Sequence, residues 1–509
     1  MRILYLPIDG RFTTHGLFCK YASIAGVELV TIPREQVGLQ KTPAHKQAVI
    51  KTITNDLRDI DAVIASKEML LHGGLIPSRN GCEPLEALID DLKYLERIRR
   101  LRPDMPVYIS ASILRTPKTS SNSEEPEYYA DYGKEIFEYC WHAHKFECLQ
   151  NEQDRLIAEH RKKKIPSEFL SDFLTRRTRN HAVNKQLVEM ARKGIITRLI
   201  IGLDDNAEYG FSVKEAQELA GISSDLADRV MIYAGTDDLQ FTLLSKLLTD
   251  QHKVNLKILP VYFRPECTGL IPAFESAPLH QTVDSHIIAS GVTNADDFDS
   301  ADIICLINNT DLEQMPQAMS KANFVRDKTV TDLTVWLRSN LAGAAGKEVI
   351  IADCCYTNGA DLNMIETLFT FKPPLDSFVY AGWNTISNTI GSAITLAIIK
   401  KLSETNNASQ FAKLNVERLV EDWAFMVDAR PEVIRAIGQN PDFDTYPIPM
   451  PYTKKCYNLA EKIMQKDLAR INKYWHTDYR VSNVHSMWQR TFDFSFDLID
   501  TDSDGGRTL

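Results

Sequence analysis

The feature of this sequence that most limits its fold is a set of short apolar segments that alternate with helical stretches. The segments are four to eight residues long and rich in Ile, Leu and Val. Strands at this spacing, separated by helices, predict a parallel sheet joined by right-handed crossovers. The expected strands span residues 2–8, 27–32, 62–65, 107–114, 199–203, 230–234, 257–263, 303–307, 349–352 and 378–381.

These strands predict an α/β protein with a mainly parallel sheet and a helical C-terminal region. About ten strands are two more than an eight-stranded barrel needs. Either a TIM-barrel-like sheet carries additional strands, or two α/β lobes abut. We expect a barrel-like arrangement in preference to a doubly wound one. We expect an α/β catalytic region over residues 1–390, with a helical insertion at about 116–196, and a mostly helical region over 391–509 that ends in a short β segment.

Two of the expected strands end in a pair of adjacent carboxylates. Asp204 and Asp205 follow the apolar run 199–203, and Asp237 and Asp238 follow the next strand. Ligands bind at the carboxyl ends of the strands in α/β proteins. One Asp of each pair can cap the following helix, but capping uses only one. The sequence therefore predicts an acidic site at this end of the sheet.

Other strand ends also carry polar or aromatic side chains. A strand-to-helix turn with Trp383 and Asn384 is typical of a surface that stacks on a sugar ring and binds its hydroxyls, although a capped core helix with a buried Trp383 fits the pattern equally well. Asp353 and Asn358 either contact a substrate or belong to a structural turn. The candidate substrate-binding residues are Asp9, Arg11, Arg79, Asp237, Asp238, Asp353, Asn358, Trp383 and Asn384.

Charge and cysteine content narrow the classes of partner. The formal net charge of −10 argues against nucleic acid and against anionic membranes. No secretory leader and no apolar run of about 18 residues is visible. Nine scattered cysteines fit reduced thiols, so a cytoplasmic protein is expected. No phosphate loop, dinucleotide fingerprint or nucleophile elbow occurs, so no cofactor is expected.

Seven short motifs together resemble a bacterial family catalogued as domain of unknown function 4127. The resemblance extends over nearly the whole chain and implies one coherent site, but it names no chemistry. In chain order the motifs begin at Leu6, Leu71, Leu114, Gly202, Gly235, Asn358 and Ala381 and read LPIDGR, LHGGLIPSR, LRTP, GLDDNAEYG, GTDD, NGAD and AGWNT.

The leading functional hypothesis is a carbohydrate-active hydrolase, a glycosidase with Asp204 and Asp205 as its catalytic pair. The arrangement is similar to that of glycosidases that act on N-acetylhexosamines by substrate assistance, in which one carboxylate orients the 2-acetamido group and the other protonates the leaving oxygen. A small molecule or an oligosaccharide is the expected substrate. Two alternatives stay open: a metal-dependent hydrolase with Asp9, Asp204 and Asp237 as ligands, and a non-catalytic sugar- or metabolite-binding protein.

Overall fold

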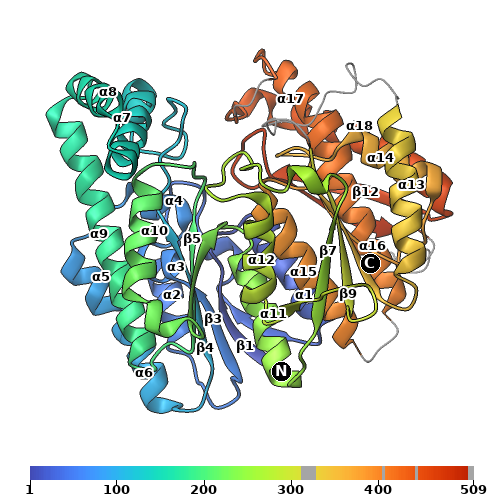
Figure 1. Cartoon of the computed structure of the whole chain (residues 1–509), viewed down its shortest axis with the longest axis horizontal. Helices are drawn as coiled ribbons and strands as arrows, with labels where there is room; N and C mark the ends of the chain where they lie inside the picture. Colours follow the sequence, from blue (N-terminus) through green and yellow to red (C-terminus); the bar gives the residue numbers. More distant parts are fainter. Residues whose placement is uncertain (311–327, 404–406, 442–444, 502–509) are drawn as a thin grey trace. The chain divides into compact units, whose positions relative to one another are not determined.

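The chain folds into two compact units, each built around its own parallel sheet. The computed structural model describes residues 1–310, 328–403, 407–441 and 445–501. The first unit contains residues 1–10, 14–244 and 274–278, and the second contains residues 11–13, 245–273 and 279–509. Figure 1 labels many of the helices and strands that the two units contain.

The sheet of the first unit has the strand order β2-β1-β3-β4-β5-β6, and every neighbouring pair is parallel. Its inner strands β3 and β4 are buried along their whole length because helices cover both faces of the sheet. A Cβ on Gly202 would lie 2.0 Å from the carbonyl oxygen of Gly235, so only glycine allows this approach at the ends of β5 and β6. The strands are β1 (Arg2–Leu6), β2 (Glu28–Thr31), β3 (Ala62–Ser66), β4 (Val107–Ile113), β5 (Arg198–Leu203) and β6 (Val230–Ala234).

The core of the first unit forms where amphipathic helices pack their apolar residues on this sheet. In the long segment between β4 and β5, α7 and α8 pack against each other, and α9 returns to the sheet (Figure 1). The helices are α1 (Leu17–Ile24), α2 (Lys46–Ile53), α3 (Lys67–His72), α4 (Leu75–Asn80), α5 (Leu85–Asp91), α6 (Lys93–Leu101), α7 (Tyr129–Leu149), α8 (Glu152–Lys164), α9 (Ser167–Arg192) and α10 (Phe211–Ile222), with the short helices Arg34–Gln36 and Ser224–Leu226.

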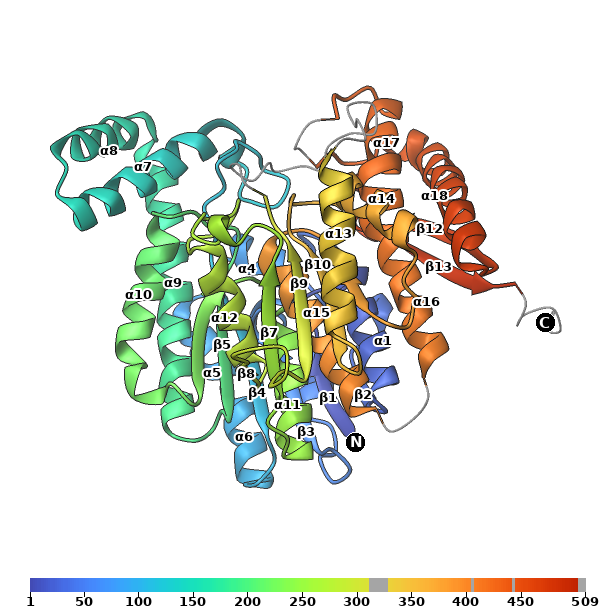
Figure 2. The same cartoon turned by 45° about the vertical axis from the view of Figure 1, so that its right-hand side comes forward.

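The sheet of the second unit is also parallel, in the order β8-β7-β9-β10-β11. Figure 2 shows β7, β9 and β10 side by side. A separate antiparallel hairpin, β12 and β13, follows at the end of the described chain. The strands are β7 (Lys257–Tyr262), β8 (Thr293–Asn294), β9 (Ile303–Asn308), β10 (Glu348–Asp353), β11 (Val379–Ala381), β12 (Tyr479–Ser486) and β13 (Phe494–Asp500).

The C-terminal helices complete the core of the second unit. Helices α15 and α16 contact the second sheet, and α18 packs on the hairpin and on the π-helix Val420–Ala429. The helices are α12 (Leu279–Ala289), α13 (Lys328–Gly343), α14 (Leu362–Phe371), α15 (Ile386–Leu402), α16 (Ala408–Leu419), α17 (Arg430–Ala436) and α18 (Thr453–Trp475), with the short helices Pro265–Cys267 and Met450–Tyr452; α11 (Leu239–His252) and the π-helix Phe12–Gly16 have residues in both units.

The two sheets share one topology. Numbered from their own first strands, both contain the order 2-1-3-4-5, which is the doubly wound, flavodoxin-like order. The sequence shows no internal repeat of fixed period, so this duplication is visible only in the structure. In such sheets ligands bind at the carboxyl ends of the strands, near the point where the strand order reverses.

The predicted α/β class, the parallel pairing and the helical C-terminal region are confirmed. The preference for a barrel was wrong, because the strands form two open sheets. A barrel and an open sheet use the same β-α-β units, so the local pattern does not separate them. All ten expected strands are present; the additional short strand β8 was not predicted because two residues carry no periodicity.

Candidate active site

Asp204 follows β5 and forms a buried ion pair with Arg79. The Asp204 Oδ2 and Arg79 Nη2 atoms are 2.5 Å apart, and both side chains are almost completely buried. Arg79 belongs to α4, which is held near β1 by a hydrogen bond of 3.1 Å from the Leu75 N–H to the Ile8 carbonyl. Helix α4 thus supplies the cation that pairs with Asp204.

Asp205 is held by a second guanidinium group. Arg115, which follows β4, places its Nη1 atom 2.6 Å from Asp205 Oδ2. Arg115 also binds Glu124 at 2.9 Å and Glu125 at 2.7 Å, and Arg79 binds the same two glutamates at 2.7 and 3.4 Å. Two guanidinium groups therefore share four carboxylates, and the network is acidic.

Asp205 differs from Asp204 in exposure and in backbone geometry. The Asp205 side chain is 32% exposed. Its φ angle of +22° is unusual for a residue other than glycine, and such strain is concentrated at functional sites. Burial has the largest effect on Asp205 and raises its pKa; Arg115 opposes this effect, and the negative charge of Asp204 reinforces it. The two carboxylates thus sit in different environments, as acid–base pairs do.

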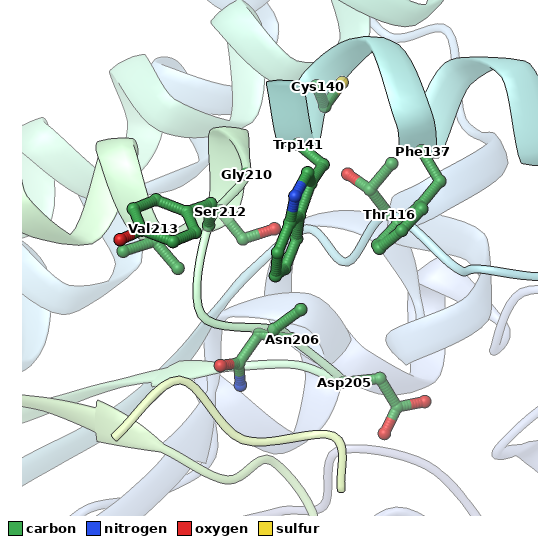
Figure 3. A pocket seen from close by; sticks show the side chains of 11 residues that line it. Thr116, Phe137, Cys140, Trp141, Asp205, Asn206, Gly210, Ser212 and Val213 are labelled. Atoms are coloured by element: carbon green, nitrogen blue, oxygen red, sulfur yellow. The ribbon is translucent and has the colours of Figure 1, made fainter. Parts of the chain in front are cut away.

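A small pocket opens beside Asp205 within the first unit. Phe137 and Trp141 come from α7, and Tyr209 comes from the loop after β5. The Phe137 and Trp141 ring centroids are 6.0 Å apart, and those of Trp141 and Tyr209 are 5.3 Å apart. Figure 3 shows the Trp141 ring extending from α7 toward the loop that carries Asn206 and Asp205. The pocket therefore joins an aromatic wall to a carboxylate.

A hydrogen bond to His144 connects α7 with the loop after β5. His144 Nδ1 accepts a hydrogen bond of 3.1 Å from the Gly210 N–H, at the start of α10. Burial lowers the pKa of His144, so the ring is neutral at neutral pH and Nδ1 stays an acceptor. The His144 and Tyr209 rings also make an edge contact at 5.9 Å. These contacts fix the aromatic wall relative to Asp205.

Three other predicted residues of the first unit are buried at strand ends. Asp9, after β1, accepts a hydrogen bond of 2.6 Å from the Thr14 hydroxyl. Asp238 directly precedes α11, and its carbonyl accepts the Thr242 N–H at 3.0 Å, as expected of a helix-starting residue. Asp237 is also buried. Their proposed contacts with substrate stay predictions.

The second unit contains a separate cluster of polar side chains at the ends of β9, β10 and β11. Asp353, which is 1% exposed, accepts hydrogen bonds from Asn308 Nδ2 at 2.9 Å, the Asp361 N–H at 2.8 Å and the Tyr380 hydroxyl at 3.1 Å. Burial and the neighbouring charge of Asp361 raise the pKa of Asp353 well above its usual value. Asp361 also caps α14 through the Asn363 N–H.

The remaining predicted residues also belong to the second unit. Asn358 and Asn384 meet through a backbone hydrogen bond of 3.1 Å, and both have positive φ angles. Trp383 is 5% exposed and lies 6.2 Å from the Phe492 ring. Arg11 is buried, with its guanidinium 4.9 Å from the centre of the Trp488 ring. A stacking role for Trp383 stays a prediction.

Sequence reasoning missed the residues that complete the network and the pocket. Arg115, Glu124 and Glu125 lie in the polar loop after β4, whose position at a strand end was the available signal. Tyr209 lies within the motif GLDDNAEYG but was not singled out. Trp141 gave no signal, because an aromatic residue on an amphipathic helix usually joins the core.

The described residues contain neither a group of side chains placed to hold a metal ion nor a helix able to span a membrane. In residues 1–310, 328–403, 407–441 and 445–501, no group of three or more His, Cys, Asp or Glu side chains is placed to hold a metal ion. Asp9, Asp204 and Asp237 therefore do not form such a group. Within the same ranges, no helix has both the length and the apolar character required to span a membrane.

The fold and the site define an α/β protein with two flavodoxin-like sheets and an acidic, aromatic-walled pocket at the strand ends of the first. The chain belongs to the family described as protein of unknown function (DUF4127), whose sequence pattern matches residues 3–497. The resemblance of the seven motifs is thereby confirmed. No curated protein and no solved structure matches this chain.

Proposed function

We propose that this protein is a carbohydrate-active hydrolase, a glycosidase that acts through Asp204 and Asp205. The observation that carries the proposal is the position of Asp205: a half-buried carboxyl group with a raised pKa, at the edge of a pocket lined by Trp141 and Tyr209. A raised pKa favours the protonated form of the carboxyl group, which a general acid requires. Aromatic faces beside carboxylates suit a sugar ring, which has an apolar face and hydroxyl groups at its edge.

The two carboxylates have different roles in this proposal. Asp205 gives its proton to the glycosidic oxygen as the bond to the anomeric carbon breaks. In an N-acetylhexosamine substrate, the acetamido oxygen bonds to that carbon. Water later displaces this oxygen from the anomeric carbon and gives its proton back to the Asp205 carboxylate. Asp204 orients the acetamido group from its ion pair with Arg79, through the oxygen that Arg79 does not hold.

The test is a panel of nitrophenyl glycosides, including N-acetylhexosaminides, with and without a chelator. We expect chelator-resistant release of nitrophenol that falls about 100-fold or more in Asp205→Asn and in Asp204→Asn. Asp172→Asn is the matched control, because Asp172 pairs with Arg176 on α9 at 2.6 Å and does not line the pocket. Full activity in both Asp204→Asn and Asp205→Asn would refute the catalytic assignment.

A sugar-binding protein without catalytic activity is the second candidate. The observation that favours it is that arginines hold one oxygen of each carboxylate. It predicts saturable binding of a sugar without release of nitrophenol from any glycoside. Release that requires a metal ion and disappears with chelator would instead support the metal-dependent hydrolase.

A further inference from the structure

Glu124 and Glu125 are adjacent glutamates in the loop after β4, and each contacts both arginines of the site. Glu124 Oε2 lies 2.7 Å from Arg79 Nη1 and 2.9 Å from Arg115 Nη2. Glu125 Oε1 lies 2.7 Å from Arg115 Nε and 3.4 Å from Arg79 Nη1. The two glutamates therefore connect the two arginines that bind the aspartate pair.

All three nitrogen atoms of the Arg115 guanidinium group donate to carboxylates. Nη1 donates to Asp205 at 2.6 Å, whereas Nη2 and Nε donate to Glu124 and Glu125. One positive charge is thus shared among three carboxylates, two of which belong to the glutamates. Arg115 fixes the position of the Asp205 carboxyl group, but it compensates only part of the negative charge around that group.

The two glutamates are held in place by α4 and are largely shielded from water. The Asn80 side chain donates a hydrogen bond of 2.8 Å to the Glu124 carbonyl oxygen, and Arg79, its neighbour on α4, binds the Glu124 carboxylate. The Glu125 side chain is 5% exposed and the Glu124 side chain 14% exposed. Charges act on one another more strongly in such a site than at a wet surface. The charges of the glutamates therefore affect the rest of the network.

The protonation of Asp205 depends on a balance of burial and charge. Burial has the largest effect on the pKa of Asp205 and raises it; Arg115 and Arg79 lower this pKa, and Asp204 raises it. The glutamates enter this balance because they bind the same two arginines. The other ionisable groups that line the pocket, a thiol and a phenol whose pKa values burial raises, are Cys140 and Tyr209.

We propose that Glu124 and Glu125 are positioning residues for Asp205. They take up part of the charge of Arg115, so that this arginine orients the Asp205 carboxyl group without favouring the loss of its proton. The inference rests on the proposed function, in which Asp205 gives that proton to the glycosidic oxygen. The loop after β4 then supplies both the cation that orients the acid and the anions that favour its protonated form.

The protonation of Asp205 can be followed in the whole protein without a substrate. Carbon-13 NMR of protein labelled at the side-chain carboxyl carbon of aspartate reports each aspartate during a pH titration, and the signal that is missing in Asp205→Asn belongs to Asp205. We expect its midpoint to fall by about 1 pH unit in Glu125→Gln and in Glu124→Gln, because each change removes one negative charge beside Arg115.

Glutamine is the appropriate replacement at both positions. Each glutamate uses a single oxygen for both arginines, and glutamine keeps one such oxygen at the same distance along the side chain. The hydrogen bonds to the arginines are therefore retained, and only the charge changes. Thermal unfolding establishes that each variant is folded under the conditions of the titration, and the more exposed Glu124 supplies the test if Glu125→Gln is not.

Glu127→Gln is the matched control, because it makes the same change in the same loop. The Glu127 side chain is 81% exposed and pairs with Lys41 at 3.1 Å, not with either arginine of the site. The midpoint of Asp205 should not move in this variant. A midpoint that stays in place or rises in a folded Glu124→Gln or Glu125→Gln variant, or that falls equally in Glu127→Gln, overturns the inference.

The pH profile of hydrolysis separates this inference from the proposed function. If both hold, the alkaline limb of kcat/KM moves to lower pH in Glu125→Gln, because less Asp205 is protonated at a given pH. Hydrolysis that requires Asp204 and Asp205, with neither the limb nor the NMR midpoint moved in the glutamine variants, overturns the inference and leaves the glycosidase in place. A lower NMR midpoint in a protein that hydrolyses no glycoside supports the effect of the glutamates on Asp205 and refutes the glycosidase.

Discussion

Arg79 and Asp204 are 125 positions apart in the chain and 2.5 Å apart in the structure, in a buried ion pair at the strand ends of the first sheet. Removal of one partner leaves the other charge buried and unpaired, which costs about 3–5 kcal/mol. We therefore expect Arg79→Ala to lower the free energy of unfolding by about that amount. Urea denaturation followed by circular dichroism measures it.

The second substitution Asp204→Asn should restore part of the stability lost in Arg79→Ala, because it removes the unpaired charge. Arg155→Ala is the control, since Arg155 and Glu152 form a solvent-exposed pair on α8; no measurable change is expected there. Equal losses in Arg79→Ala and in the double variant would contradict the paired-charge explanation.

Arg115 tunes the acidity of Asp205. Arg115 lowers the pKa of Asp205 against the larger effect of burial, so Arg115→Gln should raise that pKa further. If Asp205 is the proton donor, activity falls as pH rises through its pKa. The alkaline limb of the kcat/KM profile should therefore move to higher pH in Arg115→Gln. A limb that stays in place would show that another group is the acid.

Asp422 makes the stability of the second unit depend on pH. It accepts hydrogen bonds from Arg418 Nη2 at 2.6 Å and from the Gly382 N–H at 2.7 Å, yet burial raises its pKa from 3.8 to about 6. A raised carboxyl pKa means that the folded state holds the proton more tightly. This stabilisation is complete below pH 3.8 and is lost as pH rises through about 6.

Asp422→Asn has no proton to lose, so its stability relative to the natural protein should improve by about 3 kcal/mol between pH 3.5 and pH 7. Urea denaturation of both proteins at several pH values measures this difference, and comparison of the two cancels the titration of other groups. A difference that does not change with pH would contradict the raised pKa.

Gly202 permits the close approach of β5 to the loop after β6. A Cβ at this position would lie 2.0 Å from the Gly235 carbonyl oxygen. Gly202→Ala should therefore destabilise the protein by about 1–3 kcal/mol or more through overpacking. Gly221→Ala is the control, because a Cβ on Gly221 in α10 meets no atom within 4 Å. Thermal unfolding of both variants measures the contrast, and equal melting temperatures would refute the clash.

The sequence alone determined the local structure. Apolar segments of strand length, separated by helical stretches, predicted the ten strands of the two parallel sheets other than β8, their parallel pairing and the helical C-terminal part. Burial on both faces of a sheet requires such segments. The position of Asp204 and Asp205 after β5 was equally visible, since the end of an apolar run marks the end of a strand.

Only the tertiary structure decided how these parts combine. One barrel and two open sheets use the same β-α-β units, and the crossovers that choose between them are long-range pairings with no local pattern. The same holds for the pocket: Trp141 and Asp205 are 64 positions apart, and α7 brings them together by packing on the loop through His144 and Gly210. A helical pattern specifies which residues share a face, but not which neighbour that face will meet.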